Sequence, residues 1–137
     1  LAGDHCMHGD RRCFGNVPFM EGLMLCGLSR YHRITGDPEV LKAITVGIDQ
    51  MIQECWEEKY KTFRYTACPL SPKNYYVLFP LSAEAMVYEI ENTGNKEHLR
   101  ILREGMKTAI QRGFGGFGKS FAQGLHFTPF GLPALEN

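Results

Sequence analysis

Hydrophobic and polar positions alternate with a helical period in two stretches of the chain. Between residues 38 and 55, apolar residues recur every three or four positions and polar residues fill the gaps; the apolar set is Val40, Ile44, Ile48, Met51 and Cys55. This spacing places the apolar side chains on one face of an α-helix. The sequence therefore predicts an amphipathic helix over about 38–55 and another over about 95–112.

The segment before each amphipathic helix is apolar on nearly every side. These segments contain "PFMEGLMLCGLSRY" and "YYVLFPLSAEAMVY". A helix that is apolar all round is buried on both sides, whereas an amphipathic helix keeps one face in water. We therefore expect two inner helices over about 18–34 and 75–91, the second kinked at Pro80 because proline interrupts helical hydrogen bonding.

Short glycine-containing turns connect each inner helix to the outer helix that follows it. "TGDP" ends the first inner helix at Gly36, and "TGN" ends the second at Gly94. Glycine directly after a helix typically adopts the left-handed conformation. Asp37 is placed to cap the next helix, and Asn16 is placed to cap the helix that begins near Pro18.

The two halves of the chain form an internal repeat. Gly36 and Gly94 lie 94 − 36 = 58 positions apart, and the same offset aligns nine identical residues. Chance alone would align roughly two or three. The sequence therefore predicts an all-α fold of two antiparallel helical hairpins. The predicted boundaries are about 16–56 and 74–114 for the hairpins and 115–137 for a C-terminal loop segment, in a single domain over 1–137.

The longer connections are all expected at one end of the bundle. They are the segment before residue 16, the connection over about 56–74 and the segment after residue 112. Both inner helices run in the same direction, so these segments meet at the N-termini of the inner helices. Loops on one face of a rigid scaffold commonly carry function. We therefore expect the functional site at that end.

An apolar inner helix, a "TGDP" turn, an amphipathic outer helix and a long loop together resemble the (α/α) toroids. The stretch "PFMEGLMLCGLSRYHRITGDPEVLKAI" and a weaker counterpart, "ENTGNKEHLRIL", carry the resemblance over about residues 16–114. The chain looks like part of the superfamily of six-hairpin glycosidases, polysaccharide lyases and sugar epimerases. The resemblance implies an activity on carbohydrate. Two hairpins are about a third of such a barrel, so it also implies a piece of a longer enzyme, a core completed by self-association, or a small α-hairpin protein.

The stretch "DHCMHGDRRCFG" at residues 4–15 concentrates two His, two Cys, two Asp and two Arg. Its His and Cys lack the paired spacing of zinc sites, so we predict no metal there. The stretch is interpreted either as a polar loop that caps the bundle or as the rim of a substrate cleft. In the cleft, His8 and Asp10 are candidate catalytic groups, and Asp4 and Arg11 are candidates to bind sugar hydroxyls or a uronic carboxylate.

Four further residues near the loops are candidates. Glu21 lies in the first turns of an apolar helix, either as a catalytic carboxylate or as a charge that complements the helix dipole. Trp56, Tyr60 and Tyr76 are candidates to bind substrate, since aromatic rings stack on pyranose rings; alternatively they seal the end of the bundle. Rings and charges alternate in "KYKTFRY", which predicts a short strand within that loop.

Composition limits the partners. The chain has 15 basic and 15 acidic residues and a formal net charge of zero, so no basic surface for nucleic acid is indicated. No apolar run reaches 18 residues, so no membrane span is predicted. Cys26 and Cys55 lie in apolar helical stretches, as free core thiols do, which favours a reducing compartment such as the cytoplasm.

Three functional hypotheses follow. The first is a carbohydrate-active protein of the (α/α)-toroid type, or a fragment of one, without a cofactor. The second is a non-catalytic helical-repeat interaction module that self-associates, and the third is a small-molecule binder assembled as a dimer. Two outer helices cover only part of two apolar inner helices, so we expect a homo-oligomer or docking with the rest of a toroid. The expected contact residues are Leu23, Leu25, Leu28, Val77 and Leu81.

Overall fold

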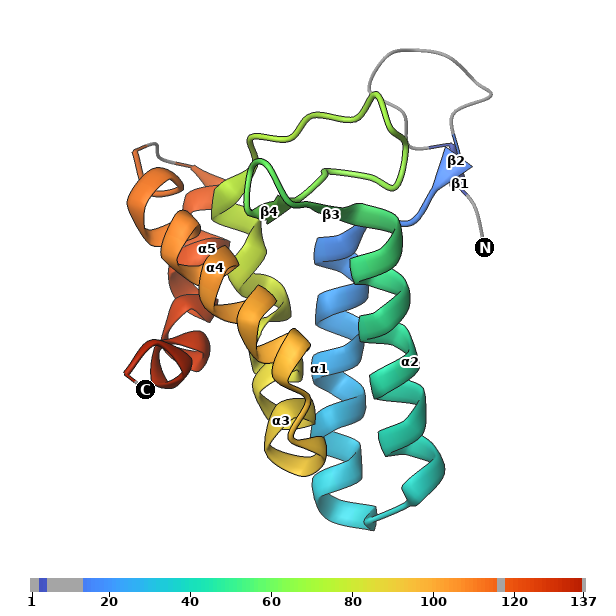
Figure 1. Ribbon diagram of the computed structural model, residues 1–137. Helices are drawn as coiled ribbons and strands as arrows, with labels where there is room; N and C mark the ends of the chain where they lie inside the picture. The colour runs from blue at the N-terminus through green and yellow to red at the C-terminus, as the bar shows by residue number, and fades with distance from the viewer. Residues whose placement is uncertain (1–2, 5–13, 116–117, 137) are drawn as a thin grey trace.

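A computed structural model describes residues 3–4, 14–115 and 118–136, and these residues are mostly helical (Figure 1). The helices are α1 (Pro18–Thr35), α2 (Pro38–Cys55), α3 (Ala83–Thr93), α4 (Lys96–Arg112) and α5 (Lys119–Gly131), with 3-10 helices η1 (Tyr76–Ser82) and η2 (Leu132–Leu135). The short antiparallel strand pairs are β1 (Gly3–Asp4) with β2 (Phe14–Gly15), and β3 (Trp56–Glu57) with β4 (Thr62–Phe63). The predicted all-α class is confirmed.

The two predicted tight turns are present. Gly36 ends α1 with a φ of 65°, and Gly94 ends α3 with a φ of 71°, both in the left-handed region. Each glycine donates its backbone N–H to a carbonyl four residues earlier, at 2.8 Å. Asp37 caps α2 as expected, since its carboxylate accepts from the backbone N–H of Glu39 at 2.9 Å. These turns make α1 and α2, and likewise α3 and α4, antiparallel neighbours (Figure 1).

The cap predicted for the first helix is wrong. Val17 occupies the capping position of α1, and its side chain makes no capping hydrogen bond. Asn16 instead donates its side-chain amide to the carboxylate of Glu54, 2.8 Å away on α2. Pro18 begins the helix, and the backbone N–H groups of Met20 and Glu21 donate to the carbonyl of Val17 at 2.9 and 3.0 Å. The amide of Asn16 joins the end of α2 to the start of α1.

Two other expectations about secondary structure are wrong. Residues 76–82 form the 3-10 helix η1, and α3 begins only at Ala83. The reason is Pro80, which lacks an N–H and crowds the preceding turn of an α-helix. The segment 115–137 is not a loop, because α5 and η2 occupy most of it. Its Gly and Pro content suggests a loop, but contacts of α5 with η1 and α3 override the weak local propensity for helix.

The segment formed by η1 and α3 lies between α1 and α5, which both contact it. Glycine brings the backbones together on each side. A Cβ at Gly22 of α1 would lie 2.9 Å from the Cα of Ser82, and a Cβ at Gly124 of α5 would lie 2.2 Å from the carbonyl oxygen of Val77. These distances leave no room for a side chain. The helices α1, η1–α3 and α5 thus form one layer, and α2 and α4 pack outside it.

The expectation that α1 is buried on both sides is wrong. Its buried face packs on η1 and α3, but four large apolar side chains are exposed on the helix, namely Met20, Met24, Tyr31 and Ile34. By contrast, the residues that were predicted to contact a partner are mostly covered within the chain. Leu25 and Leu81 are fully buried, and Leu23, Leu28 and Val77 are half-buried. Contacts of η1 with α4 and α5 cover the face that the sequence leaves unpartnered.

A buried polar cluster joins the two hairpins. Glu89 of α3 is fully buried, and its carboxylate lies 2.8 Å from Nδ1 of His98 on α4. The other ring nitrogen of His98 lies 2.8 Å from the carboxylate of Asp49 on α2. Thr93 donates its hydroxyl to Glu89 at 2.9 Å. A protonated imidazole donates from both nitrogens, so this geometry suits a charged His98 between two carboxylates.

The substitution Gly36→Ala should lower the free energy of unfolding by about 1 kcal/mol, because alanine must adopt the left-handed conformation there. Gly27→Ala is the matched control: Gly27 lies inside α1, and a Cβ added there meets no atom within 4 Å. Alanine should stabilise the helix at that position. Urea unfolding followed by circular dichroism measures both variants. Equal effects at the two positions would contradict the role of Gly36.

The free energy of unfolding should fall as pH rises above about 6.5. Burial lowers the pKa of His98, but the hydrogen bonds with Glu89 and Asp49 raise it by more, so its folded pKa lies above the ordinary 6.5. Such a group stabilises the fold fully below its unfolded pKa, and the contribution disappears as pH rises through the folded pKa. Urea unfolding of the wild type and of His98→Gln should give a stability difference that shrinks as pH rises. A difference independent of pH would contradict this assignment.

Candidate functional site

The long connections meet at one end of the helices, as predicted. Figure 1 shows the loop over residues 56–75 and the chain entering α1 at the same end, opposite the turns at Gly36 and Gly94. We call this end the loop end. The backbone N–H of Ala67 donates to the carbonyl of Asn16 at 2.8 Å, which joins the loop to the start of α1. The candidate site is therefore built on this loop.

The first part of the loop is the β3–β4 hairpin, which confirms the predicted short strand. Lys61 lies in its turn with a positive φ of 51°. The indole N–H of Trp56 donates to the carboxylate of Glu58 at 2.7 Å. The Trp56 ring meets the rings of Phe63 and Phe79 edge-on, with centroids 5.7 and 6.1 Å away. The half-buried Trp56 therefore packs the hairpin onto η1.

Ion pairs attach this hairpin to α4. Lys61 of the hairpin pairs with Glu104 of α4 at 2.9 Å and also contacts Glu58. Arg100 of α4 bridges Glu58 at 3.2 Å and Glu104 at 2.7 Å. Hydrogen bonds from Lys61, then Trp56 and Arg100, lower the pKa of Glu58 to about 2. Exposed pairs of this kind contribute little each, but together they fix the orientation of the hairpin relative to α4.

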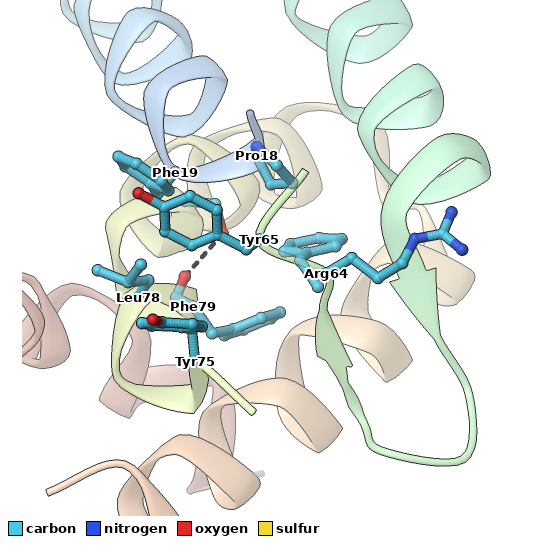
Figure 2. A pocket seen from close by; sticks show the side chains of 9 residues that line it. Pro18, Phe19, Arg64, Tyr65, Tyr75, Leu78 and Phe79 are labelled. Atoms are coloured by element: carbon cyan, nitrogen blue, oxygen red, sulfur yellow. Dashed lines mark hydrogen bonds between the residues drawn. The ribbon is translucent and has the colours of Figure 1, made fainter. Parts of the chain in front are cut away.

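Aromatic rings fill the space between the loop and the helices (Figure 2). Tyr65 lies 5.3 Å from Phe19 of α1 and 4.9 Å from Tyr75, measured between ring centroids. Figure 2 shows the side chain of Arg64 pointing away from these rings. The cavity between them measures only about 10 Å³, which is room for about one water molecule. This cluster therefore seals the end of the bundle and leaves no space for a sugar ring.

An open groove lies further along the same loop. It has a volume of about 430 Å³, and it is lined by Tyr60, Pro69, Leu70, Ser71, Lys73 and Asn74. We call it the loop-end groove. Its loop is held in shape by hydrogen bonds from the backbone N–H of Thr66 to the Ser71 hydroxyl, 2.8 Å, and from Tyr65 to the carbonyl of Pro72, 2.9 Å. Grooves of this size accommodate small ligands.

Two lysines lie beside Tyr60. Lys59 places its ammonium 5.6 Å from the centre of the Tyr60 ring. Lys73 lies 3.5 Å from the carboxylate of Glu57, which Arg64 also contacts at 3.0 Å. One carboxylate is thus shared between two cations. The groove is therefore lined by an aromatic ring and one lysine, Lys73, and a second lysine, Lys59, lies close to the same ring.

The structure brings only part of the predicted site together. Tyr60 lines the loop-end groove, whereas the ring of Tyr76 faces the guanidinium of Arg112, 5.9 Å away. Asp4 belongs to β1, where its backbone pairs opposite Phe14. The remaining candidates in the opening stretch lie outside the described residues: His8, Asp10 and Arg11. Among the described residues that were predicted to be catalytic or to bind sugar, Tyr60 is the one that lines the groove.

Glu21 has an unusual environment for a carboxylate. One of its oxygens, Oε2, is buried and has no hydrogen-bond partner among the described residues. Burial, and then the negative charge of Glu54, raise the pKa of Glu21. A raised pKa suits a general acid. However, Glu21 is not among the residues that line the loop-end groove, so the geometry does not connect it to that site.

Sequence analysis missed Lys73 and Asn74 as groove residues. The signal was present in "CPLSPKN", where two prolines precede the polar residues Lys73 and Asn74 between the aromatic stretches. Proline restricts the backbone and favours an ordered turn. An ordered loop of this kind can hold polar side chains in place at the surface.

The described residues carry no other recognised chemical centre. Among residues 3–4, 14–115 and 118–136, no three His, Cys, Asp or Glu side chains are grouped so that they could hold a metal ion. Within those same ranges, no helix has both the length and the apolar character needed to cross a bilayer. Cys26 and Cys55 are buried free thiols, as expected, but Cys68 is disulfide-bonded.

Comparison with known proteins yields no relative. No protein-family model, no curated protein and no solved structure matches this chain. The resemblance to the (α/α) toroids therefore stays a prediction.

Cys26 and Cys55 should resist alkylation in the folded protein. Burial raises the pKa of Cys26 to about 11 and that of Cys55 to about 12. The reactive thiolate is therefore scarce near neutral pH. Iodoacetamide labelling mapped by mass spectrometry should leave both residues unmodified in the native protein and modify both in urea. Rapid labelling of either thiol before unfolding would contradict their placement in the core.

Proposed function

We propose that the loop-end groove binds an acidic saccharide, in a protein of the (α/α)-toroid type. The observation that carries the proposal is that the Tyr60 ring, Lys73 and the amide of Asn74 line one open groove, with a second lysine, Lys59, beside the Tyr60 ring. Sugars are recognised by aromatic rings that stack on their C–H faces and by polar groups that bind their hydroxyls. The resemblance of the helical hairpins to carbohydrate-active toroids points to the same class of ligand.

The polar groups of the groove suit a carboxylated sugar. Asn74 is exposed at the groove, and its amide both donates and accepts hydrogen bonds, as ring hydroxyls require. Lys59 and Lys73 supply two ammonium groups near Tyr60. Glu57 is shared between Lys73 and Arg64, so it leaves positive charge at the groove. That charge favours a uronic acid over a neutral sugar.

The proposal is for binding and names no reaction. The described catalytic candidate, Glu21, does not line the groove. Hydrolysis, elimination and epimerisation each need an acid or base within hydrogen-bond reach of the substrate. The groove residues supply positioning groups and charge, which is sufficient for recognition.

We also propose the interaction-module hypothesis as a second candidate, on a separate observation. The exposed apolar side chains of α1 include Met20, Met24 and Ile34, and they lie on one helix. Contiguous apolar surface of this kind commonly marks a protein–protein contact. A groove that binds sugar and a helix that binds protein are compatible in one chain.

The saccharide proposal predicts that Tyr60→Ala weakens binding of an oligogalacturonate by at least about tenfold, because the stacking surface is lost. Tyr60→Phe should bind nearly as well, since it keeps the ring. Lys73→Gln should weaken binding of the acidic oligosaccharide but not of a neutral oligosaccharide of equal length. Isothermal titration calorimetry measures all three.

Lys42→Gln is the matched control for Lys73→Gln. Lys42 is an exposed lysine of α2 and does not line the groove. Its loss should leave affinity unchanged. The proposal fails if the wild type binds neither oligosaccharide, or if Tyr60→Ala binds as tightly as the wild type.

A further inference from the structure

The exposed face of α1 carries an apolar stripe with a regular spacing. Its members follow one another at intervals of four, three, four and three residues: Met20, Met24, Gly27, Tyr31 and Ile34. This is the spacing of the contact seam between two packed helices. The four large side chains are 57%, 59%, 53% and 86% exposed, respectively. We call this set the α1 stripe.

The α1 stripe lies on the opposite side of the helix from the buried contact with η1. Gly22 marks that buried contact, where the backbones of α1 and η1 meet. Gly124 marks the equivalent contact of α5 with η1. Gly27 occupies the centre of the α1 stripe, and a Cβ there would meet nothing within 4 Å. The exposed face of α1 therefore resembles the two contacts with η1, because a glycine at its centre permits another backbone to approach closely.

We propose that the α1 stripe is the interface of a two-fold homodimer, in which two copies of α1 pack antiparallel with Gly27 at the axis. The stripe is nearly symmetric about Gly27, with apolar residues seven positions before and after it. Antiparallel pairing then places Met20 against Ile34 of the partner subunit, and Met24 against Tyr31 of the partner subunit. A two-fold interface requires such self-complementarity, because both copies use the same patch.

The charges around the stripe are compatible with this contact. The stripe itself contains no ionisable group that is charged at neutral pH. Arg30 lies beside it, but its guanidinium already binds the carboxylate of Glu84 through two hydrogen bonds, at 3.0 and 2.8 Å. Docking therefore buries no unpaired charge, which would otherwise oppose association. The dimer is independent of saccharide binding, since the α1 stripe and the loop-end groove share no residue.

The area of the stripe sets the strength of the dimer. A large side chain that is more than half exposed presents on the order of 100 Å². Four of them give about 400 Å² per copy, below the roughly 800 Å² per partner of a standard stable interface. We therefore expect a weak dimer that dissociates on dilution.

The first test is sedimentation equilibrium of the full chain across a wide concentration range. The weight-average mass should rise with concentration from 15.5 kDa towards twice that value. Met24→Glu should keep the protein monomeric, because it places a charge in the seam, whereas Met24→Leu should still dimerise. Met24 is exposed, so both variants should keep the wild-type thermal unfolding when dilute. A wild type that stays monomeric, or a Met24→Glu variant that dimerises as the wild type does, would overturn the proposal.

Cross-linking tests the geometry without depending on those variants. Gly27→Cys should form an intermolecular disulfide with a second copy of itself, identified by mass spectrometry of the linked peptides. Met20→Cys should cross-link with Ile34→Cys when the two variants are mixed, and not with itself. Ala43→Cys, at an exposed position on α2, is the control and should stay unlinked. Self-linking of Met20→Cys would indicate parallel helices and overturn the proposed arrangement.

Discussion

The packing of η1 against every neighbouring element is the constraint on which the rest of the fold depends. Gly22 and Gly124 let the backbones of α1 and α5 approach η1 without intervening side chains. Gly105 of α4 leaves room for the side chain of Phe79 on η1, since a Cβ at Gly105 would lie 2.1 Å from that ring. The Phe79 ring also stacks on Phe63, with centroids 5.1 Å apart, which fixes the strand hairpin. One short segment thus positions the helices and the base of the loop end.

This arrangement explains why the candidate site lies where it does. The aromatic rings around η1 pack against one another, so the aromatic cluster at the loop end closes the bundle. The loop-end groove lies outside that cluster, between Tyr60 in the turn of the β3–β4 hairpin and residues 69–74 later in the loop. The ion pairs of Arg100 and Lys61 hold the hairpin that precedes the groove. The core and these ion pairs therefore hold the residues that line the groove in place.

The sequence predicts most local features correctly, but it does not predict the features that depend on tertiary contacts. The glycine turns and the buried stripe of α2 follow from conformational preference and helical period, which act within a few residues. The 3-10 geometry around Pro80, the helix α5 and the open face of α1 depend on which segments pack together. The groove residue Lys73 was missed for the same reason, since its proximity to Tyr60 arises from the fold of the loop. Tyr60 was predicted from its residue type alone, and the structure shows that it lines a groove.

The buried cluster of Glu89, His98 and Asp49 has a consequence for the evolution of this architecture. Helical repeats are ordinarily modular, because each unit contacts its neighbour through equivalent surfaces. Here the offset of 58 aligns Glu89 with Tyr31, His98 with Val40 and Asp49 with Lys107, so the cluster exists once and in one direction. Glu89 and His98 belong to the same hairpin and pair with each other, whereas Asp49 reaches His98 from the other hairpin. The contact between Asp49 and His98 is therefore specific to this pair of hairpins, because the offset of 58 places no equivalent side chains at the matching positions.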